Sequence, residues 1–384
     1  MRRTYNRGGW SVVALYGVTL AISGIIGNVV AVLMSVGVTA NLDLSGDIIH
    51  SIQDAIDKIT SSPEYIDAMV LASLIGSALG MGLGMLLMHL ILPKDRTAVP
   101  YRKLGGGEYA VTILMAFGLW GVGALIGNLP EFFGVHITTG MEEASDGVMW
   151  IFMFYALFGA PLLEELAFRK LLLDAMHPYG KTVAAFTSAM LFGLMHGNSA
   201  QFMLAFMLGL LLAAVYMNTG NIWYTILIHF LINLTGSLPD LFMFLGIDIS
   251  IPWYVVVGML VLAGFVTAIV YGPHAEVLRL SRPEIPDANR QAFKNPGMLF
   301  AMIGGLVLIG VNDLMQIIGD VLRKEGAVTM IRLIPTTLAI LSVIFIAAFV
   351  GRKTKPEAPA PIADPSGPDS HTAPADPEDQ TGTF

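Results

Sequence analysis

The chain of 384 residues contains no cysteine and few charged side chains. Without cysteine it can form no disulfide, no thiolate metal site and no cysteine nucleophile, and it carries no sign of the redox state of its compartment. Charged residues make up 13% of the chain, roughly half of the share in soluble domains, whereas hydrophobic residues make up 55%. A soluble protein could not bury this much apolar surface in one core, so the composition indicates a membrane protein.

Apolar runs long enough to cross a bilayer, about 20 residues each, recur along the chain. We predict an all-α, polytopic transmembrane helical bundle of about ten spans, in which the fifth and seventh are short. The first apolar run, residues 10–40, is too long for the apolar part of a cleavable signal, so we interpret it as a spanning helix. The predicted spans are residues 10–38, 66–92, 107–129, 148–175, 182–197, 199–217, 222–238, 250–271, 297–319 and 330–350.

The loops between these spans alternate in charge. Lys and Arg gather before the first span and after the second, fourth, eighth and tenth spans, whereas Asp and Glu gather in loops of the other side. Because cytoplasmic loops carry the excess of Lys and Arg, both termini are predicted to be cytoplasmic in a multi-pass protein, with the plasma membrane as the expected location. The expected partners are the lipid bilayer and a membrane-associated peptide or protein, and not nucleic acid.

Composition divides the chain into four parts. Residues 1–147 hold the N-terminal spans with external acidic loops, including an amphipathic stretch at 48–59 that predicts a surface helix. Residues 148–240 and 241–350 hold the central and C-terminal spans, and residues 351–384, rich in Pro, Ala and Asp, predict a disordered acidic cytoplasmic tail. In the second span, Gly76, Gly80 and Gly84 form a small-residue face, for which packing within the chain is favoured over a dimer contact.

The fourth predicted span carries ionisable side chains that membrane segments rarely hold. Its run PLLEELAFRK contains Glu164, Glu165 and Arg169. Residues four apart share a helical face, so Glu165 can pair with Arg169, while Glu164 is rotated by about 100° and can face another helix. Ionisable residues inside a membrane are usually functional, although a structural Glu–Arg pair with a second, uninvolved Glu is the plainer alternative.

Two further spans add polar side chains. The fifth ends in FGLMH, with Phe192 and His196, and the seventh contains HFLIN, with His229 and Asn233. Alone, each is more often structural: a core histidine in the first case, an interhelical hydrogen-bonding pair in the second. Counted from the cytoplasmic helix ends, however, these polar residues and Glu164 lie about 10 to 21 Å deep, near mid-bilayer. The matched depth favours one shared site over three separate clusters.

These residue types suit hydrolysis of a peptide bond. A carboxylate can take the proton of an attacking water, and His or Asn donors can stabilise the oxyanion in a dry site. We assign Glu164 as the general base, His196 and His229 as residues that position the water, and Asn233 as the donor to the oxyanion. Alternatively, His196 and His229 together with a Glu could hold a zinc ion that leaves one position open for water. The supporting residues are Glu165, Arg169 and Phe192.

The three runs resemble motifs of the CPBP intramembrane proteases, which include type II CAAX prenyl endopeptidases and bacteriocin-processing proteins. EELAFR is similar to that family's EExxxR, FGLMH to its FxxxH and HFLIN to its HxxxN, in the same order, within residues 148–236. The resemblance implies an all-α bundle with a cavity open to the cytoplasm and a protease core at residues 148–240. It maps Glu164, His196, His229 and Asn233 onto the family's catalytic set. It leaves open both the substrate and whether the enzyme is a metalloprotease or of the glutamate type.

Other protease classes fit the sequence less well, and a non-catalytic class remains as the alternative. A rhomboid-type serine protease would use Ser199 in GNSA, but the HxxxN element then stands in the wrong order, and the later His274 lies in a polar loop. No HExxH or GxGD occurs. The main alternative is a peptide-immunity membrane protein or a proton-coupled transporter, which would use a polar stripe in the ninth span. That stripe consists of Asn312, Asp313, Gln316 and Asp320.

Overall fold

The computed structural model describes residues 1–39, 58–59, 61–129, 145–280 and 288–323. Over these residues the chain is helical and contains no strand, which confirms the predicted all-α class. Eight of the described helices are long and apolar enough to cross a membrane. They are α1 (Arg2–Thr39), α3 (Pro63–Ile91), α4 (Gly106–Gly127), a composite helix (residues 146–179), α10 (Ser199–Thr219), α11 (Ile222–Phe244), α12 (Ser250–Val270) and α14 (Pro296–Arg323).

The composite helix corresponds to the fourth predicted span and changes its winding along its length. It consists of α6 (Asp146–Phe154), the π-helix η1 (Tyr155–Gly159), α7 (Ala160–Glu165), the π-helix η2 (Leu166–Leu173), α8 (Asp174–Met176) and the 3₁₀ turn η3 (His177–Tyr179). The remaining short elements are α13 (Ala288–Phe293) and the 3₁₀ turns η4 (Gly272–His274) and η5 (Glu276–Leu278).

The predicted fifth span is a helix too short to cross a bilayer. This helix, α9 (Lys181–Met195), has 15 residues. At 1.5 Å per residue it extends for about 22 Å, whereas the hydrocarbon core is about 30 Å thick. The predicted tenth span, the tail at 351–384 and most of the stretch at 48–59 lie outside the described residues, so these predictions and the four-part division of the chain stay predictions.

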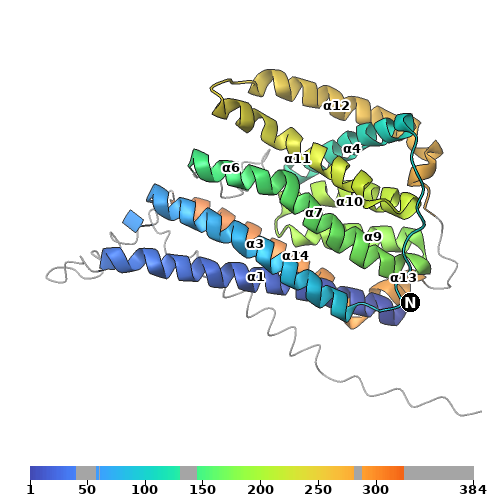
Figure 1. Cartoon of the computed structure of the whole chain (residues 1–384), viewed down its shortest axis with the longest axis horizontal. Helices are drawn as coiled ribbons and strands as arrows, with labels where there is room; N and C mark the ends of the chain where they lie inside the picture. The colour runs from blue at the N-terminus through green and yellow to red at the C-terminus, as the bar shows by residue number, and fades with distance from the viewer. Residues whose placement is uncertain (40–57, 60, 130–144, 281–287, 324–384) are drawn as a thin grey trace, which may run out of the picture.

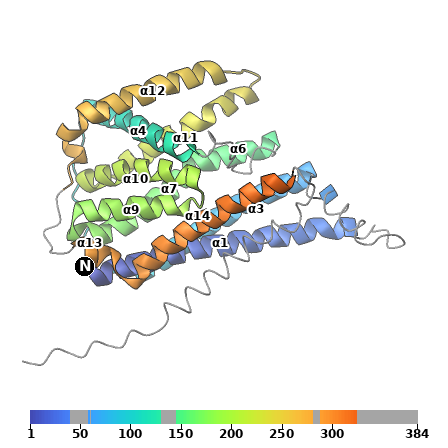
Figure 2. The same ribbon diagram turned by 180° about the vertical axis from the view of Figure 1, so that it is seen from behind.

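The helices are arranged around the composite helix and α9 (Figure 1). On one side α1 packs along α3 and α14, and on the other side α10 packs against α4, which in turn packs against α12. Seen from behind, α9 and α10 lie side by side and stop short of the end that α1, α3 and α14 reach (Figure 2). The turn that joins α9 to α10 is therefore held inside the bundle rather than at its outer end.

The ends of α10 explain why the chain turns sharply into α11. Gly220, with φ 62°, ends α10 in the left-handed conformation that glycine adopts most easily. The side chain of Asn221 then accepts a hydrogen bond from the N–H of Trp223 at 3.1 Å and caps the start of α11. These two residues place α11 antiparallel to α10, which brings His229 and Asn233 back toward the centre of the bundle.

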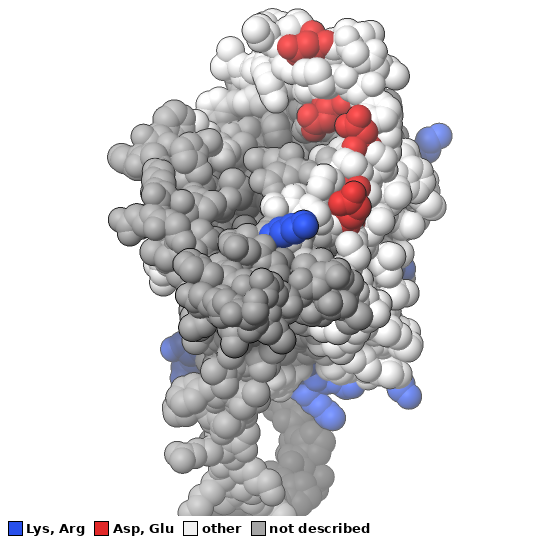
Figure 3. Space-filling view, turned by 90° about the vertical axis from the view of Figure 1, so that its left-hand side faces the viewer, with Lys and Arg blue, Asp and Glu red and all other residues white. Residues whose placement is uncertain are grey.

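Charge separates along the bundle axis. Figure 3 looks onto one end, where Asp and Glu side chains gather. These acidic residues are Glu64, Asp67, Asp146, Asp240 and Asp248, at the outer ends of α3, α6, α11 and α12. The N-terminus and the segment between α3 and α4 lie at the opposite end and carry Arg2, Arg3, Lys94, Arg96, Arg102 and Lys103. The orientation of the two ends in the membrane stays a prediction.

The glycine face of α3 packs against α1, as the interpretation of packing within the chain predicted. A Cβ atom on Gly76 would lie 2.6 Å from Cα of Ser23, and one on Gly80 would lie 2.5 Å from Cα of Thr19. The two backbones are therefore so close that only glycine fits between them. By contrast, a Cβ atom on Gly82 of the same helix would meet nothing within 4 Å.

We expect Gly80→Ala to destabilise the protein and Gly82→Ala to be neutral or slightly stabilising. The methyl group at position 80 would force α1 and α3 apart, at a cost of about 1–3 kcal/mol. At position 82 the alanine only improves helix propensity. Thermal unfolding of the two purified variants in detergent would measure the difference. Equal midpoints would contradict the close contact between α1 and α3.

Candidate active site

The composite helix is locally wound as a π-helix on both sides of Glu164 and Glu165. In a π-helix each N–H bonds to the carbonyl five residues earlier. Pro161 has no N–H, so the carbonyl of Ala156 lacks its π-helical partner. Asn233 of α11 donates a hydrogen bond from Nδ2 to this carbonyl at 2.8 Å. The proline therefore leaves an acceptor free that orients the amide of Asn233.

Glu165 lies at the centre of a buried triad with Arg169 and His229. Its Oε2 atom lies 3.1 Å from Nε of Arg169, and its Oε1 atom lies 3.1 Å from Nδ1 of His229. The side chains of Glu165 and Arg169 are both fully buried. A lone carboxylate would be very unfavourable in such surroundings, and here Arg169 supplies the countercharge near Oε2 while His229 hydrogen-bonds to Oε1. The pair Glu165–Arg169 forms as the four-residue spacing predicts, and α11 adds His229 to it.

Glu164 faces the other nitrogen of the same histidine. Its Oε2 atom lies 3.7 Å from Nε2 of His229, and its side chain is 13% exposed. With Glu165 ionised by its pairing with Arg169, Nδ1 of His229 is the nitrogen that donates to it. In the neutral ring Nε2 is then the acceptor, a tautomer that we assign from the hydrogen-bonding partners. The two glutamates thus occupy opposite sides of one imidazole.

Phe192 links the triad to His196. The centre of the Arg169 guanidinium lies 4.5 Å from the centroid of the Phe192 ring, a cation–π contact. The same ring stands nearly perpendicular to His229 and to His196, with centroid distances of 5.8 and 5.0 Å. His196 follows the last residue of α9, and its Nδ1 lies 2.9 Å from the carbonyl oxygen of Phe192. Its Nε2 is therefore the acceptor in the neutral ring.

The predicted residues thus lie in one region, but some contact each other directly and His196 does so only through another residue. Glu164, Glu165 and Arg169 surround His229, and Asn233 lies one turn further along α11. His196 contacts the group through Phe192, and within the described part of the chain no hydrogen bond joins it to either glutamate. Sequence reasoning missed the carbonyl of Ala156, although Pro161, five residues later, was a usable signal for it.

The predicted zinc site is not formed by these side chains as they stand. His229 uses Nδ1 toward Glu165, the kind of support that a metal-bound histidine has, and its Nε2 faces Glu164. A zinc site needs at least three such ligands. In the described ranges, no group of three or more His, Asp or Glu side chains is close enough to hold a metal ion. A zinc ion held by His196 and His229 therefore stays a prediction.

We expect Arg169→Met to destabilise the protein far more than Lys170→Met. Removal of Arg169 leaves the Glu165 carboxylate buried without its countercharge, which costs about 3–5 kcal/mol. Lys170 pairs with Asp174 at 2.8 Å, but its side chain is 44% exposed and Asp174 keeps a hydrogen bond from Tyr216. Its loss should cost about 1 kcal/mol or less. Denaturant unfolding in micelles would measure both values, and similar losses would contradict a structural role for the triad.

Comparison with known proteins identifies the part of the chain that carries this arrangement. Residues 146–235 match the family model described as Rce1-like, type II CAAX prenyl endopeptidase Rce1-like. No curated protein and no solved structure matches the chain. The matched range begins at the start of the composite helix and ends two residues after Asn233, so it includes all the residues of the candidate site. Over residues 146–235 the chain is therefore similar to the type II CAAX prenyl endopeptidases, and this match supports the resemblance to the CPBP family intramembrane proteases.

Proposed function

We propose that this protein hydrolyses a peptide bond of a membrane-associated or leader-type peptide, with a water molecule activated by Glu164. The observation that carries the proposal is the spacing of Glu164 and His229, whose Oε2 and Nε2 atoms lie 3.7 Å apart. Both atoms are acceptors in the assigned state, so one water could donate a hydrogen to each of them. The water oxygen would then point its lone pair away from both, toward an approaching carbonyl carbon.

The chemistry follows from the charges of the side chains. Glu164 takes a proton as the water oxygen attacks the peptide carbonyl, and it returns that proton to the leaving amine when the C–N bond breaks. Glu165 keeps a proton on Nδ1 of His229 and so leaves Nε2 free to hold the water. His196, with Nδ1 toward its own helix, offers Nε2 as an alternative acceptor to Nε2 of His229, because one water has only two hydrogens to donate.

Asn233 supports the proposed oxyanion role through its fixed amide. One N–H of Nδ2 is directed to the carbonyl of Ala156, which leaves the second N–H for the tetrahedral oxygen. A donor fixed before the reaction stabilises the developing charge without reorganisation. The amide is held by the composite helix, the same element that carries Glu164, so base and donor keep one relative position.

The substrate class is proposed from the position of the site. Glu164 and His229 lie in helices that are apolar enough to cross a membrane, so the scissile bond must be brought to the bilayer. The type II CAAX prenyl endopeptidases named by the family match act on prenylated peptides. Among the described residues we find no feature specific for a prenyl group, so the proposal extends to membrane-associated peptides as a class. We further propose that both termini are cytoplasmic in a plasma-membrane protein, on the basis of the charge separation.

Replacement of the proposed base tests the reaction. We expect Glu164→Gln to lower the cleavage rate by about 10²–10⁴-fold, since the amide cannot accept the proton. The measurement compares protein termini in membranes of host cells that express the wild type or the variant at matched levels. Glu108→Gln is the control, because Glu108 pairs with Arg102 at 3.1 Å, away from the site.

New termini that require Glu164 and survive Glu108→Gln would identify a substrate together with the activity. Identical termini in all samples, with each protein folded and inserted, would contradict proteolysis. That result would favour a non-catalytic immunity or transport protein.

The oxyanion role gives a separate expectation. We expect Asn233→Ala to lower the rate by about 10²–10³-fold, as for other oxyanion donors. Asn28→Ala is the matched control, because Asn28 likewise donates to a backbone carbonyl, that of Gly24 at 2.7 Å, but on the exposed face of α1. The measurement compares the cleavage rates of the two variants, per folded enzyme, on the substrate that the comparison of termini identifies. A loss below threefold for Asn233→Ala would contradict this role.

A further inference from the structure

The turn between α9 and α10 carries His196 and has an unusual conformation. Gly197 has φ 72°, in the left-handed region. The Asn198 side chain caps α10 by accepting a hydrogen bond from the N–H of Gln201 at 2.8 Å, and its Nδ2 donates to the carbonyl of His196 at 3.1 Å. These contacts define the shape of the turn, but they join residues of the turn and the start of α10 to each other. They do not fix the turn relative to the other helices.

Asp313 of α14 accepts a hydrogen bond from this turn across the helix boundary. Both of its carboxylate oxygens lie 3.3 Å from the backbone N–H of Ser199, the first residue of α10. The N–H groups of the first helical turn have no partners within the helix, and the helix dipole places partial positive charge there. A carboxylate at this point therefore stabilises the helix end and has its own charge compensated. This contact also explains why Asp313, one residue of the polar stripe in the predicted ninth span, is acidic.

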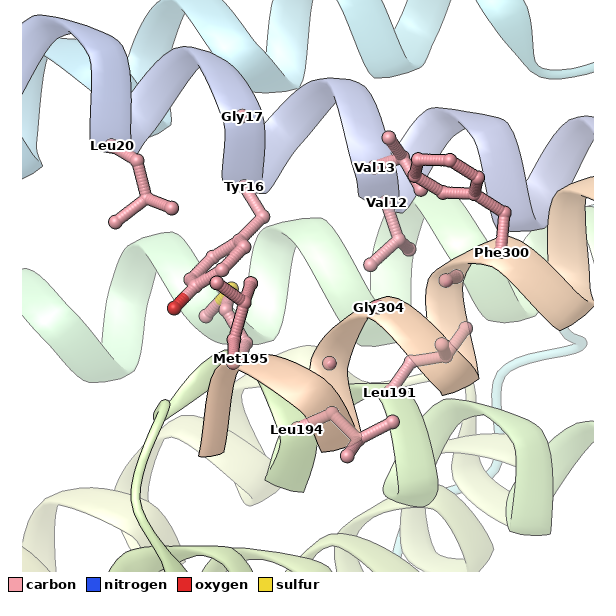
Figure 4. Close-up of a pocket in the computed structure, with 13 residues that line it drawn as sticks. Val12, Val13, Tyr16, Gly17, Leu20, Leu191, Leu194, Met195, Phe300 and Gly304 are labelled. Carbon is pink, nitrogen blue, oxygen red and sulfur yellow. The ribbon is translucent and has the colours of Figure 1, made fainter. Parts of the chain in front are cut away.

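α14 approaches the turn closely along one face. A Cβ atom on Gly305 would lie 2.9 Å from Cβ of Leu194 in α9, so glycine allows the two helices to approach. Figure 4 shows α14 beside Leu191, Leu194 and Met195, with Tyr16 of α1 completing the surroundings. Between the three helices lies a partly open pocket of about 80 Å³ with an almost entirely apolar lining. Close packing at Gly305 places the polar part of α14 beside the turn.

We infer that Asp313 is a positioning residue for the proteolytic reaction: it holds the α9–α10 turn, and through the turn the imidazole of His196. The inference rests on the proposed function. It assigns a role to a helix that lies outside the matched range of residues 146–235. Among the described residues, the ring of His196 contacts Phe192 and its carbonyl accepts from Asn198, so the imidazole follows the backbone of the turn. A shift of the turn would therefore move His196 while Glu164, Glu165 and His229 keep their places.

Three variants of α14 separate charge, hydrogen bonding and general packing. Asp313→Ala removes the acceptor, and Asp313→Asn keeps one acceptor oxygen without the charge. Asn312→Ala is the matched control on the neighbouring position of the same helix. Two measurements are made on each purified protein: amide hydrogen exchange of the peptide that spans residues 196–202, and kcat and KM on the substrate identified by its new termini.

We expect Asp313→Ala to speed exchange of this peptide at least tenfold and to lower kcat about 10- to 100-fold, the effect of a misplaced reacting group, with KM changed less than twofold. Asp313→Asn should restore both values to within about threefold of the wild type, because its carbonyl oxygen still accepts the Ser199 N–H. A purely structural role would lower the thermal midpoint without this separation of kcat from KM and without rescue by Asn.

The inference would be overturned if Asp313→Ala left the exchange of this peptide unchanged. It would also be overturned if Asp313→Ala sped the exchange but kept the same kcat as the Asn312→Ala control. The exchange measurement does not need a substrate. If the wild type cleaves nothing, the proposed function fails, and with it the catalytic part of the inference. Exchange would then still decide whether Asp313 holds the turn.

Discussion

The arrangement of the site depends on one fully buried carboxylate. Glu165 pairs with Arg169 on its own helix and with His229 on α11, so a single side chain joins two separate helices and sets the direction of the imidazole. Because Glu165 is fully buried, it needs both partners. Without Arg169 its charge would lack a countercharge, and without His229 its Oε1 atom would lack a hydrogen bond. Arg169 adds the ring of Phe192 to the group, and Phe192 touches His196. The three sequence motifs are therefore connected physically through Glu165 and Arg169.

Much of this could be predicted from residue types and spacing. Apolar runs predict the helices, and the four-residue spacing of Glu165 and Arg169 predicts their pairing, since both are local properties of a helix. The partner of each glutamate could not be predicted, because it depends on how α11 packs against the composite helix. Nor could the contact of Asp313 with the N–H of Ser199 be predicted, because it joins residues 114 positions apart. The polar stripe of the ninth span suggested a transporter because its contacts with another helix were unknown.

The winding of the composite helix combines two features that are separate in the sequence. Pro161 would merely loosen an α-helix, but within the π-helical stretch it leaves the carbonyl of Ala156 for Asn233. A second π-helix follows Glu165 and includes Arg169. Wider winding of this kind is frequent at functional sites, and here it flanks the two glutamates on both sides. The composite helix therefore supplies side chains to the site and also a backbone acceptor.

The shortness of α9 has a consequence for how such a protein can change over evolutionary time. His196 follows directly on a helix of 15 residues, so the length of α9 sets how deep the imidazole lies. Insertion or deletion of one residue would move the ring by about 1.5 Å and turn it by about 100° around the axis. Only a change of one or more whole turns, in steps of about 5.4 Å, would nearly preserve its direction. The depth of the His196 imidazole in the bilayer can therefore change only in discrete steps. Adaptation to a slightly thicker or thinner membrane must then come from tilting the bundle rather than from lengthening α9.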